Sequence, residues 1–315
     1  MRVTAARLIE HGKPLEIQEV ELPEPGDGEV VLEVAFSGVN PVDMYAAEGR
    51  VAAEAPVPRT LGTEGAGTVD GRPVVARGYG VGTARDGLWA NAAVVPRAAL
   101  VDVPEGVDLK TAAAMGVAGV TAWRTVHELA RISADDTVLV LGASGGVGSI
   151  IVSAAHAAGA TVIGQTGQPD NSGWITERGA DDVIVTDARG LADAAARFRL
   201  TAVFDGLGDG FTGAAIEALQ PHGRLVIFGA SAGPEGQVPL QSLYSKGIQV
   251  LGYAGLLESD EAMSSAIGKA LRALAAGELS VPVDAALPLD QVGQAFERIG
   301  DREVLGKLVL DTHGG

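Results

Sequence analysis

The stretch that most constrains the fold of this chain is TVLVLGASGGVGSIIVSAAHAAGATVIGQTG, residues 137–167. It begins with a short apolar run that is typical of a strand buried on both faces, and a glycine-rich turn then leads into a helix. Apolar residues recur along that helix at the spacing of one face, at Val147, Ile150, Ile151, Ala154, Ala155 and Ala158. A second strand follows, so the stretch predicts a βαβ unit of a parallel sheet.

The glycine turn fits two chemistries. Gly142, Gly145 and Gly148 match a G-x-x-G-x-x-G dinucleotide loop. The first glycine permits the turn, the second lets backbone N–H groups reach a pyrophosphate, and the third lets the helix pack closely on the strand. The residues that this interpretation assigns to the cofactor are Gly142, Ala143, Ser144, Gly145, Gly146, Val147 and Gly148.

The same turn also reads G-x-S-x-G, the nucleophile elbow of a serine hydrolase, and Asp205 and His222 follow Ser144 in the required order. An elbow normally follows several strands of its own sheet, whereas a different, β-rich region precedes this one. No HGGG-like oxyanion stretch lies upstream either. The cofactor is therefore the preferred interpretation.

The pattern changes twice along the chain. Residues 1–120 contain short alternating or β-branched runs between Gly, Pro and Asp turns, which predict a β-rich domain. Strands alternate with helices over residues 121–259, which predicts an α/β domain with a doubly wound parallel sheet. Residues 260–315 read as a helix and a final strand, too short for another domain, so we expect them to pack against one of the first two.

Composition excludes several functions. The 315 residues include no cysteine, which excludes disulfides, thiol catalysis and cysteine-ligated zinc. The formal net charge of −17 disfavours nucleic acid as a partner. There is no run of 18 apolar residues and no signal-peptide core near the start, so we expect no membrane association and a cytoplasmic location.

Further motifs occur in order along nearly the whole chain: SGVNPVDMYAAEGR, LGTEGAGTV, AAAMGVAGVTAW, GASGGVGS, GRLVIFGAS and GKLVL. Together they resemble the medium-chain dehydrogenase/reductase superfamily, and within it the zinc-free quinone oxidoreductase (zeta-crystallin-like) branch. The resemblance implies a GroES-like catalytic domain over residues 1–120, completed by residues 260–315, and a Rossmann NADP-binding domain over residues 121–259. It also implies a cofactor between the domains and a homodimer.

Zinc members of that superfamily carry a cysteine ligand three residues before an aspartate and a histidine ligand in a GHE stretch. Here Asn40 stands three residues before Asp43, and Thr63 stands within GTE. Both are poor zinc ligands, and the five histidines are scattered without ligand spacing, so we expect no metal. A conjugated acceptor needs less polarisation than a simple carbonyl, because delocalisation spreads the developing charge.

By resemblance, Asn40, Asp43 and Tyr45 are the candidate catalytic residues, at the nicotinamide end of the cofactor. Asn40 is expected to bond the ribose or substrate oxygen, and Tyr45 to orient substrate or donate a proton. Asp43 has an alternative as a buried carboxylate that ties its loop together. The remaining positions that the resemblance assigns to the cofactor are Thr121, Phe228, Gly229 and Ala230. Leu88 and Trp89 are expected to wall the substrate pocket, and Trp89 has an alternative as a core residue.

The choice between NAD and NADP depends on the end of the second Rossmann strand. An NAD enzyme places Asp or Glu there, about 20 residues after the first glycine. This chain has Gln165, Thr166 and Gly167, which form the last group assigned to the cofactor. No carboxylate would repel a 2′-phosphate, so NADPH is predicted. Arg189 is a candidate replacement for the family's usual phosphate ligands.

The sequence thus predicts an NADPH-dependent oxidoreductase that transfers a hydride to a quinone or an α,β-unsaturated carbonyl without zinc. Two alternatives stay open. One is an enoyl-thioester reductase of a biosynthetic pathway, resembling acryloyl-CoA reductases. The other is a non-catalytic NADPH-binding protein of the crystallin type.

Overall fold

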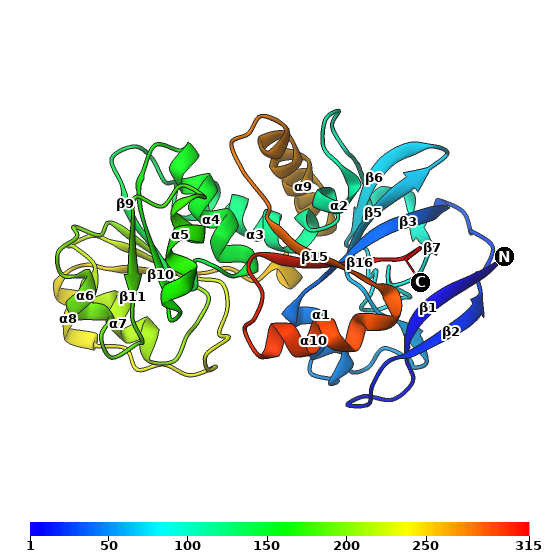
Figure 1. The fold of residues 1–315 in the computed structure, drawn as a ribbon, viewed down its shortest axis with the longest axis horizontal. Helices are drawn as coiled ribbons and strands as arrows, with labels where there is room; N and C mark the ends of the chain where they lie inside the picture. Colours follow the sequence, from blue (N-terminus) through cyan, green and yellow to red (C-terminus); the bar gives the residue numbers. More distant parts are fainter. Residues whose placement is uncertain (315) are drawn as a thin grey trace. The chain divides into compact units, whose positions relative to one another are not determined.

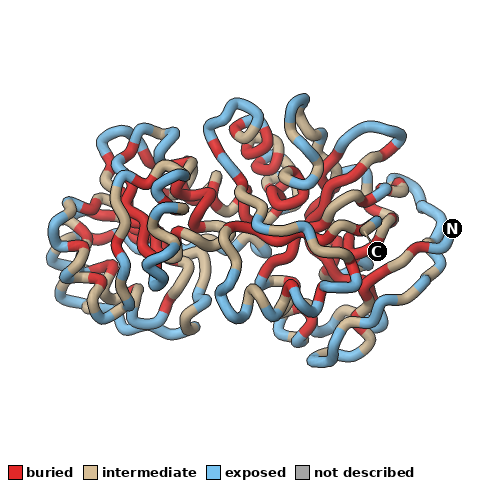
Figure 2. The backbone as a smooth tube through the Cα atoms, viewed as in Figure 1, coloured by how far each residue is buried: buried red, intermediate tan, exposed pale blue. Residues whose placement is uncertain are grey.

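The computed structural model describes residues 1–314, which form two compact units. The first unit contains residues 1–120, 258–275 and 281–314. The second contains residues 121–257 and 276–280. In each unit the buried backbone is concentrated in the strands and in the helices that cover them (Figure 2).

The second unit is built on a six-stranded parallel sheet in the order β11-β10-β9-β12-β13-β14. Its strands are β9 (Thr137–Val140), β10 (Thr161–Thr166), β11 (Asp182–Val185), β12 (Ala202–Asp205), β13 (Arg224–Ile227) and β14 (Gln249–Gly252). The strand order reverses beside β9, at the glycine turn, as in doubly wound sheets. The predicted parallel Rossmann-type sheet is confirmed.

Helices and turns precede, connect and follow these strands (Figure 1). They are α3 (Val120–Arg124), the π-helix η3 (Thr125–Leu129), α4 (Gly146–Ala157), α5 (Ser172–Thr176), α6 (Leu191–Ala195), α7 (Gly210–Ala218), α8 (Leu240–Ser245), and the 3₁₀ turns η4 (Pro169–Asn171) and η5 (Gly255–Leu257). Four residues of the predicted apolar stripe, Ile150, Ile151, Ala154 and Ala155, are buried on α4, whereas Val147 and Ala158 at its two ends are half-buried.

The first unit contains two sheets. A three-stranded sheet has the order β2-β1-β4, and a seven-stranded one has the order β15-β16-β3-β5-β6-β8, with β7 also paired to β3. The strands are β1 (Arg2–Leu8), β2 (Glu16–Glu21), β3 (Glu29–Val39), β4 (Arg59–Thr60), β5 (Glu64–Val69), β6 (Arg72–Arg77), β7 (Ala92–Pro96), β8 (Leu100–Asp102), β15 (Val283–Pro288) and β16 (Lys307–Asp311). A β-rich unit therefore precedes the α/β unit, as predicted.

The C-terminal segment returns to the first unit. Strand β16 pairs antiparallel with β3, Leu308 opposite Val39, and the two run side by side in Figure 1. The helices of this unit are α1 (Pro41–Ala47), α2 (Leu109–Ala112), the π-helix η2 (Met115–Gly119), α9 (Asp260–Ala275), α10 (Val292–Gly300), and the 3₁₀ turns η1 (Arg97–Ala99) and η6 (Leu289–Gln291). Residues that are more than 260 positions apart in the sequence are thus neighbours in one sheet.

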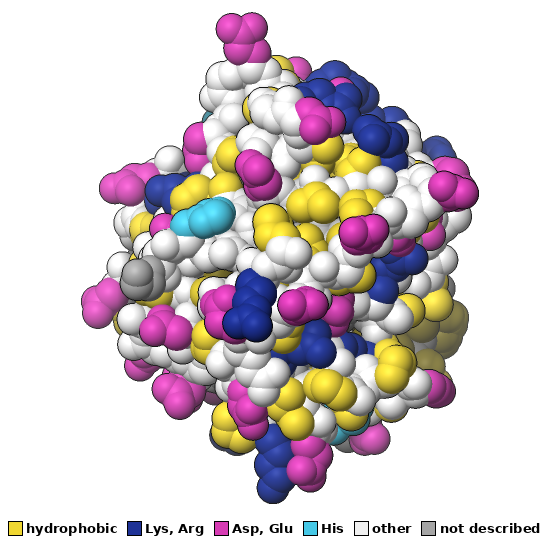
Figure 3. Space-filling model, turned by 90° about the vertical axis from the view of Figure 1, so that its right-hand side faces the viewer, with side chains coloured by type: hydrophobic (Ala, Val, Ile, Leu, Met, Phe, Trp, Pro, Cys, Tyr) yellow, Lys and Arg dark blue, Asp and Glu magenta, His cyan; other side chains and the backbone are white. Residues whose placement is uncertain are grey.

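The surface carries mixed charge. On the face shown in Figure 3, acidic and basic side chains are interspersed with apolar ones, and no basic tract dominates. In the described part of the chain, no helix is both long enough and apolar enough to cross a bilayer.

Candidate functional site

The second unit gathers its predicted cofactor residues at one edge of its sheet. The turn after β9, Gly167 after β10, and Phe228 to Ala230 after β13 all follow the carboxyl ends of parallel strands. The carboxyl ends of neighbouring parallel strands lie at the same edge, where open α/β sheets bind ligands. Thr121 lies on α3, outside this row of loops.

The geometry of the glycine turn explains its residues. Gly142 has a φ of +64°, a left-handed conformation that glycine adopts without strain. A Cβ on Gly148 would lie 2.3 Å from the carbonyl oxygen of Gly142, so helix α4 can approach the turn this closely only without a side chain there. The N–H of Gly145 donates to the same carbonyl at 3.0 Å.

Helix α4 begins directly after Gly145, its N-cap. The first N–H groups of an α-helix have no acceptor within the helix, and the helix dipole adds positive potential at that end. Such a turn is suited to a phosphate or pyrophosphate group. The residues present therefore fit the pyrophosphate of a dinucleotide.

The side chain of Gln165, on β10, holds this turn in place. Its side chain is 2% exposed, its Oε1 accepts the N–H of Gly142 at 3.0 Å, and its Nε2 donates to the carbonyl of Thr186 at 2.7 Å. Both ends of the amide are thus bonded to backbone. Thr166 is also buried, with its Oγ1 accepting the N–H of Gln168 at 3.1 Å. Gln165, Thr166 and Gly167 are the residues predicted to contact the cofactor at the end of β10. Of these, Gly167 is exposed, and a Cβ added to it would meet no atom within 4 Å.

The hydrolase alternative does not assemble. Ser144 Oγ accepts a hydrogen bond from Asn171 Nδ2 at 3.2 Å. Asp205 is fully buried and accepts from the N–H groups of Leu207 and Gly208 and from the Thr212 hydroxyl. His222 precedes β13, at the amino edge of the sheet, whereas Ser144 follows β9 at the carboxyl edge. A Ser-His-Asp triad needs side chains in hydrogen-bond contact, and here the length of the strands separates His222 from Ser144.

In the first unit, Asp43 is a tether at the start of α1. It is 1% exposed, its Oδ2 accepts the N–H of Asn40 at 2.9 Å, and its Oδ1 accepts the N–H of Thr63 at 3.0 Å. This geometry matches the structural alternative for Asp43, a carboxylate that joins the α1 loop to the segment before β5. Burial raises the pKa of Asp43 to about 6, against the lowering effect of its hydrogen bonds with Thr63 and Asn40, and the Glu64 carboxylate adds to the rise.

Asn40 belongs to a buried charged cluster that sequence reasoning did not identify, formed by Asn40, Asp43, Glu64 and Lys307. Glu64 is fully buried; its Oε1 accepts from Asn40 Nδ2 at 2.7 Å and from Lys307 Nζ at 3.2 Å. Its Oε2 accepts the N–H of Val117, in the π-helix η2, at 2.6 Å. Asn40 Oδ1 accepts from the Lys307 ammonium, so the Asn40 amide is held inside the protein at both ends.

Two glycines make room for this cluster. A Cβ on Gly38 would stand 2.1 Å from Glu64 Oε1, and one on Gly116 would lie 3.1 Å from Glu64 Cβ. Glu64 lies in the motif LGTEGAGTV and Lys307 in GKLVL, at the start of β5 and of β16. Each is a charged residue at the first position of its strand, and that placement was the available signal.

Tyr45 is half-buried on α1, and the guanidinium of Arg50 lies over its ring at 4.3 Å from the centroid. Arg50 thus supplies a cation five residues after this tyrosine. Leu88 and Trp89 are fully buried; Trp89 donates from Nε1 to the carbonyl of Gly38 and packs on Phe296. The core, rather than a pocket wall, is where the structure places both.

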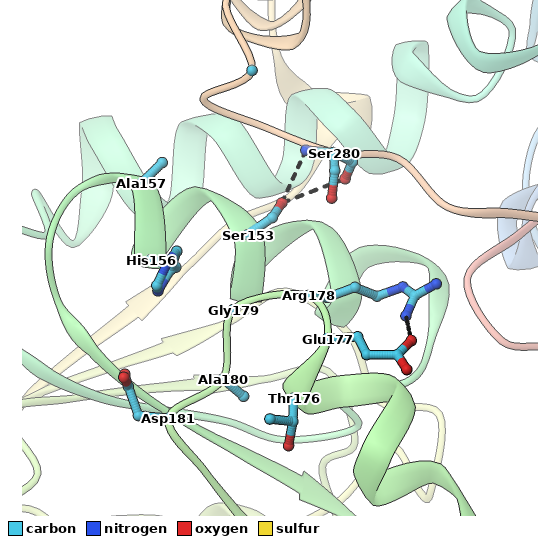
Figure 4. Close-up of a pocket in the computed structure, with 11 residues that line it drawn as sticks. Ser153, His156, Ala157, Thr176, Glu177, Arg178, Gly179, Ala180, Asp181 and Ser280 are labelled. Carbon is cyan, nitrogen blue, oxygen red and sulfur yellow. Dashed lines mark hydrogen bonds and ion pairs between the residues drawn. The ribbon is translucent and has the colours of Figure 1, made fainter.

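A depression of about 510 Å³ lies elsewhere on the second unit. As Figure 4 shows, it is formed by the C-terminal half of α4, the segment between α5 and β11, and Ser280, which is bonded to Ser153. These segments lie at the amino edge of the sheet. It is therefore distinct from the edge that carries the glycine turn.

Zinc does not fit the first unit. Among residues 1–314, no three His, Cys, Asp or Glu side chains come together to hold a metal ion. Of the two positions that resemble zinc ligand positions, Thr63 offers a hydroxyl, and the oxygen of Asn40 is already bonded to an ammonium. Amide and hydroxyl oxygens are poor partners for zinc, which prefers thiolate, imidazole and carboxylate.

Comparisons with known proteins agree with this architecture. Residues 26–105 match the alcohol dehydrogenase GroES-like domain, and residues 146–272 match the zinc-binding dehydrogenase family. A quinone oxidoreductase of Pseudomonas aeruginosa is 27% identical, and the match covers 94% of this chain and 95% of that protein.

A phthioceranic/hydroxyphthioceranic acid synthase of Mycobacterium tuberculosis is 31% identical over 94% of this chain, which spans only 15% of that protein. Among solved structures, a mycobacterial protein in complex with NADPH superposes with a TM-score of 0.86 at 26% identity, covering 98% of this chain and 99% of that chain. The predicted family and fold are confirmed: the chain belongs to the quinone oxidoreductase branch of the medium-chain dehydrogenase/reductase superfamily, with a GroES-like unit followed by a Rossmann unit.

Proposed function

We propose that this protein is a zinc-independent oxidoreductase that uses NADPH to reduce a quinone or an α,β-unsaturated carbonyl. The observation that carries the proposal is the pairing of two features in one chain. One is a phosphate-binding turn at the start of α4, and the other is a catalytic-type unit whose charged cluster holds a lysine ammonium and no metal donor set.

The bound nicotinamide would supply the hydride. The chain's own contribution begins with the turn, where Gly142 to Gly148 would hold the pyrophosphate and fix the cofactor's register. Phe228, Gly229 and Ala230, at the end of β13, would offer backbone groups to the carboxamide. Thr121 would contact the ribose or phosphates.

In the first unit, Asp43 and the Asn40 amide fix the start of α1, and with it the position of Tyr45. The hydroxyl of Tyr45 is the group we assign to bonding the acceptor oxygen and donating a proton to it. Arg50, stacked on the ring and paired with Glu48 at 3.1 Å, would hold a guanidinium close to that hydroxyl. Asn40 acts through the loop, because its amide is engaged internally.

NADPH over NADH is proposed on the residues around the end of β10. Gln165 presents no carboxylate and is bonded to backbone at both ends, and Gly167 leaves open space. Arg189 follows β11, the strand beside β10, so it belongs to the same edge and is exposed. A guanidinium there is suited to a 2′-phosphate.

A conjugated acceptor suits a site without a Lewis acid. Reduction of a simple carbonyl concentrates negative charge on one oxygen, which zinc stabilises in other enzymes. In a quinone or an enone that charge is delocalised, so a hydroxyl and a guanidinium give sufficient help. The likeness to a quinone oxidoreductase supports the same class of acceptor.

The test is to mix the protein with NADPH or NADH and, separately, benzoquinone, phenanthrenequinone and an enoyl thioester, and to follow the loss of reduced-nicotinamide absorbance. We expect turnover of the quinones with NADPH preferred over NADH. Tight NADPH binding without turnover of any acceptor would refute the reductase and leave the non-catalytic binding protein.

An enoyl-thioester reductase is the second candidate. It is favoured by the 31% identity to the mycobacterial acid synthase, which exceeds the 27% identity to the quinone oxidoreductase. In the same assay, a kcat/KM for the thioester above that for either quinone would establish this candidate instead.

We also propose that the protein is a homodimer joined through β14. This strand ends the parallel sheet, so one side of its backbone lacks a neighbouring strand. Exposed apolar side chains occur on this strand, at Val250, and in the segments that flank it in the sequence, at Leu240, Tyr244, Leu256 and Leu257. A second copy pairing edge to edge would cover both the backbone groups and these side chains.

A further inference from the structure

We propose that Lys307 is the internal cation of the first unit: its buried ammonium takes the place of a bound metal ion, holding Asn40 and Glu64 and excluding divalent cations from the positions of Asn40 and Thr63. The proposal concerns the charge of the site, so it stands whether the acceptor is a quinone or an enoyl thioester.

The ammonium is fully engaged. Lys307 Nζ donates to the carbonyl of Val39 at 3.0 Å, to Glu64 Oε1 at 3.2 Å and to Asn40 Oδ1. An ammonium has three protons, so these three acceptors use all of its donors. Its side chain is 4% exposed and that of Glu64 is 0% exposed. The charge is therefore fixed in place rather than mobile at the surface.

The three acceptors come from three elements. Val39 ends β3, Asn40 precedes α1, and Glu64 begins β5. A metal ion joins separate elements in the same way, by collecting electron-pair donors around one positive charge. Lys307 does so with a cation that is part of the chain, at the first residue of β16.

The same contacts explain why a metal is kept out. A divalent ion bound at residue 40 would lie close to the ammonium, and two cations in a buried site repel each other strongly. Lys307 and Val117 also occupy both oxygens of Glu64, the fully buried carboxylate that is bonded to the Asn40 side-chain amide. Divalent cations are thus excluded for two reasons. The Lys307 ammonium repels them, and the Glu64 carboxylate is not available as a ligand.

The experiment restores metal donors with and without the lysine. The N40C/T63H variant gains a thiol and an imidazole at the positions that resemble zinc ligand positions, while Lys307 remains. The N40C/T63H/K307M variant loses the ammonium as well and frees Glu64. N40C/T63H/K307R is the matched control, because it retains a positive charge.

Each variant is titrated with Co²⁺ under reducing conditions, and the visible d–d absorption and thiolate charge-transfer bands are recorded, with circular dichroism to confirm folding. We expect stoichiometric Co²⁺ binding only in the K307M background. Its affinity should exceed that of the two charged backgrounds by at least about tenfold, the scale on which groups beside a metal's ligands act. Zn²⁺ should displace the Co²⁺ signal.

Two results would overturn the proposal. Equal Co²⁺ affinity with and without Lys307 would show that the ammonium does not exclude a metal. No Co²⁺ binding in either background would show that something else excludes it. If K307M does not fold because Glu64 is left unpaired, the same comparison is made with K307M/E64Q, which removes both charges together.

Discussion

At the scale of single residues, Gly148 is the glycine of the second unit at which an added Cβ would come nearest to another atom. A Cβ on Gly148 would lie 2.3 Å from the Gly142 carbonyl oxygen and 3.1 Å from Ala143 Cα, both of them backbone atoms that cannot rotate away. We expect Gly148→Ala to move α4 off the turn. It should lose NADPH affinity and about 1–3 kcal/mol of unfolding free energy, as overpacked cores do.

The matched control is Gly173→Ala, in the exposed short helix α5, where a Cβ would meet nothing within 4 Å. It should keep both NADPH affinity and stability. The two variants are compared by fluorescence titration with NADPH and by urea unfolding. Normal affinity in G148A would show that the phosphate site does not depend on this close packing.

Asp43 predicts a pH dependence of stability. Burial raises its pKa from 3.8 to about 6, so the folded protein holds this proton to higher pH than the unfolded chain does. The contribution of Asp43 to the free energy of unfolding is fully present below pH 4 and is lost as the pH rises through 6. At about 1.4 kcal/mol per pKa unit, the loss is up to about 3 kcal/mol.

The measurement is the urea unfolding free energy from pH 4 to 7.5, compared with Asp43→Asn, which cannot titrate there. Glu29, Asp108 and Asp136 have lowered pKa values and act in the opposite direction, but they are the same in both proteins and cancel in the difference. Glu64 and Lys307 face Asp43 and act oppositely on its pKa, the first raising and the second lowering it. A pH-independent difference between the two proteins would contradict the raised pKa.

Tyr45 is tested by Tyr45→Phe. If its hydroxyl donates the proton, kcat should fall about 10²–10⁴-fold while NADPH affinity is unchanged, the usual range for a lost general acid. Tyr244→Phe is the control, because Tyr244 lies on α8, in the proposed dimer contact, and has no role in the proposed proton transfer. The steady-state kcat of both variants is measured, and an unchanged kcat in Y45F would refute the role of Tyr45 as proton donor.

At the scale of elements, the two edge strands of the parallel sheet give a matched pair. Val250 on β14 is 45% exposed and Val185 on β11 is 44% exposed. A lysine on an edge strand blocks pairing with another strand. We expect Val250→Lys to convert the dimer into a 31.9 kDa monomer and Val185→Lys to leave it a dimer, as measured by light scattering after size exclusion. A monomeric wild-type protein, or dissociation by V185K, would contradict the assignment to β14.

Prediction from the sequence was most successful for elements whose signal is local. The strands and helix around the glycine turn were predicted close to their observed bounds, because buried strands and a one-faced helix show a strong period. Helix α10 was not predicted, although Val292, Ala295, Phe296 and Ile299 have helical spacing. Strands β14 and β15 were also missed, since they are short and only partly buried.

The candidate site was predictable only in part, for a different physical reason. The phosphate turn is local in sequence, so its residues could be named together. The buried charged cluster joins residues 40, 64 and 307. Nothing in the sequence near Asn40 shows that its amide will be bonded to a lysine more than 260 residues away. Motifs indicated which segments matter, but the pairing within the cluster arises from sheet topology.

At the scale of the whole molecule, the net charge of −17 predicts a dependence on salt. Like charges repel more in the compact state, and raising the ionic strength from about 0.01 M to about 0.15 M shortens the Debye length from about 30 Å to about 8 Å. We expect the melting temperature to rise by about 2–4 °C, as for a gain of about 1 kcal/mol. A melting temperature that falls as KCl raises the ionic strength would contradict net self-repulsion.

The pairing of β16 with β3 also bears on how the chain folds as it leaves the ribosome. The second unit is nearly continuous in sequence, so it can close its sheet once β14 has emerged. The first unit begins the chain yet must wait for residues 283–311 to complete its seven-stranded sheet. Until then the edge of β3 and the carboxylate of Glu64 have no partner from β16. Residues 1–120 are thus synthesised before the second unit but complete their sheet after it, which makes them dependent on protection during synthesis.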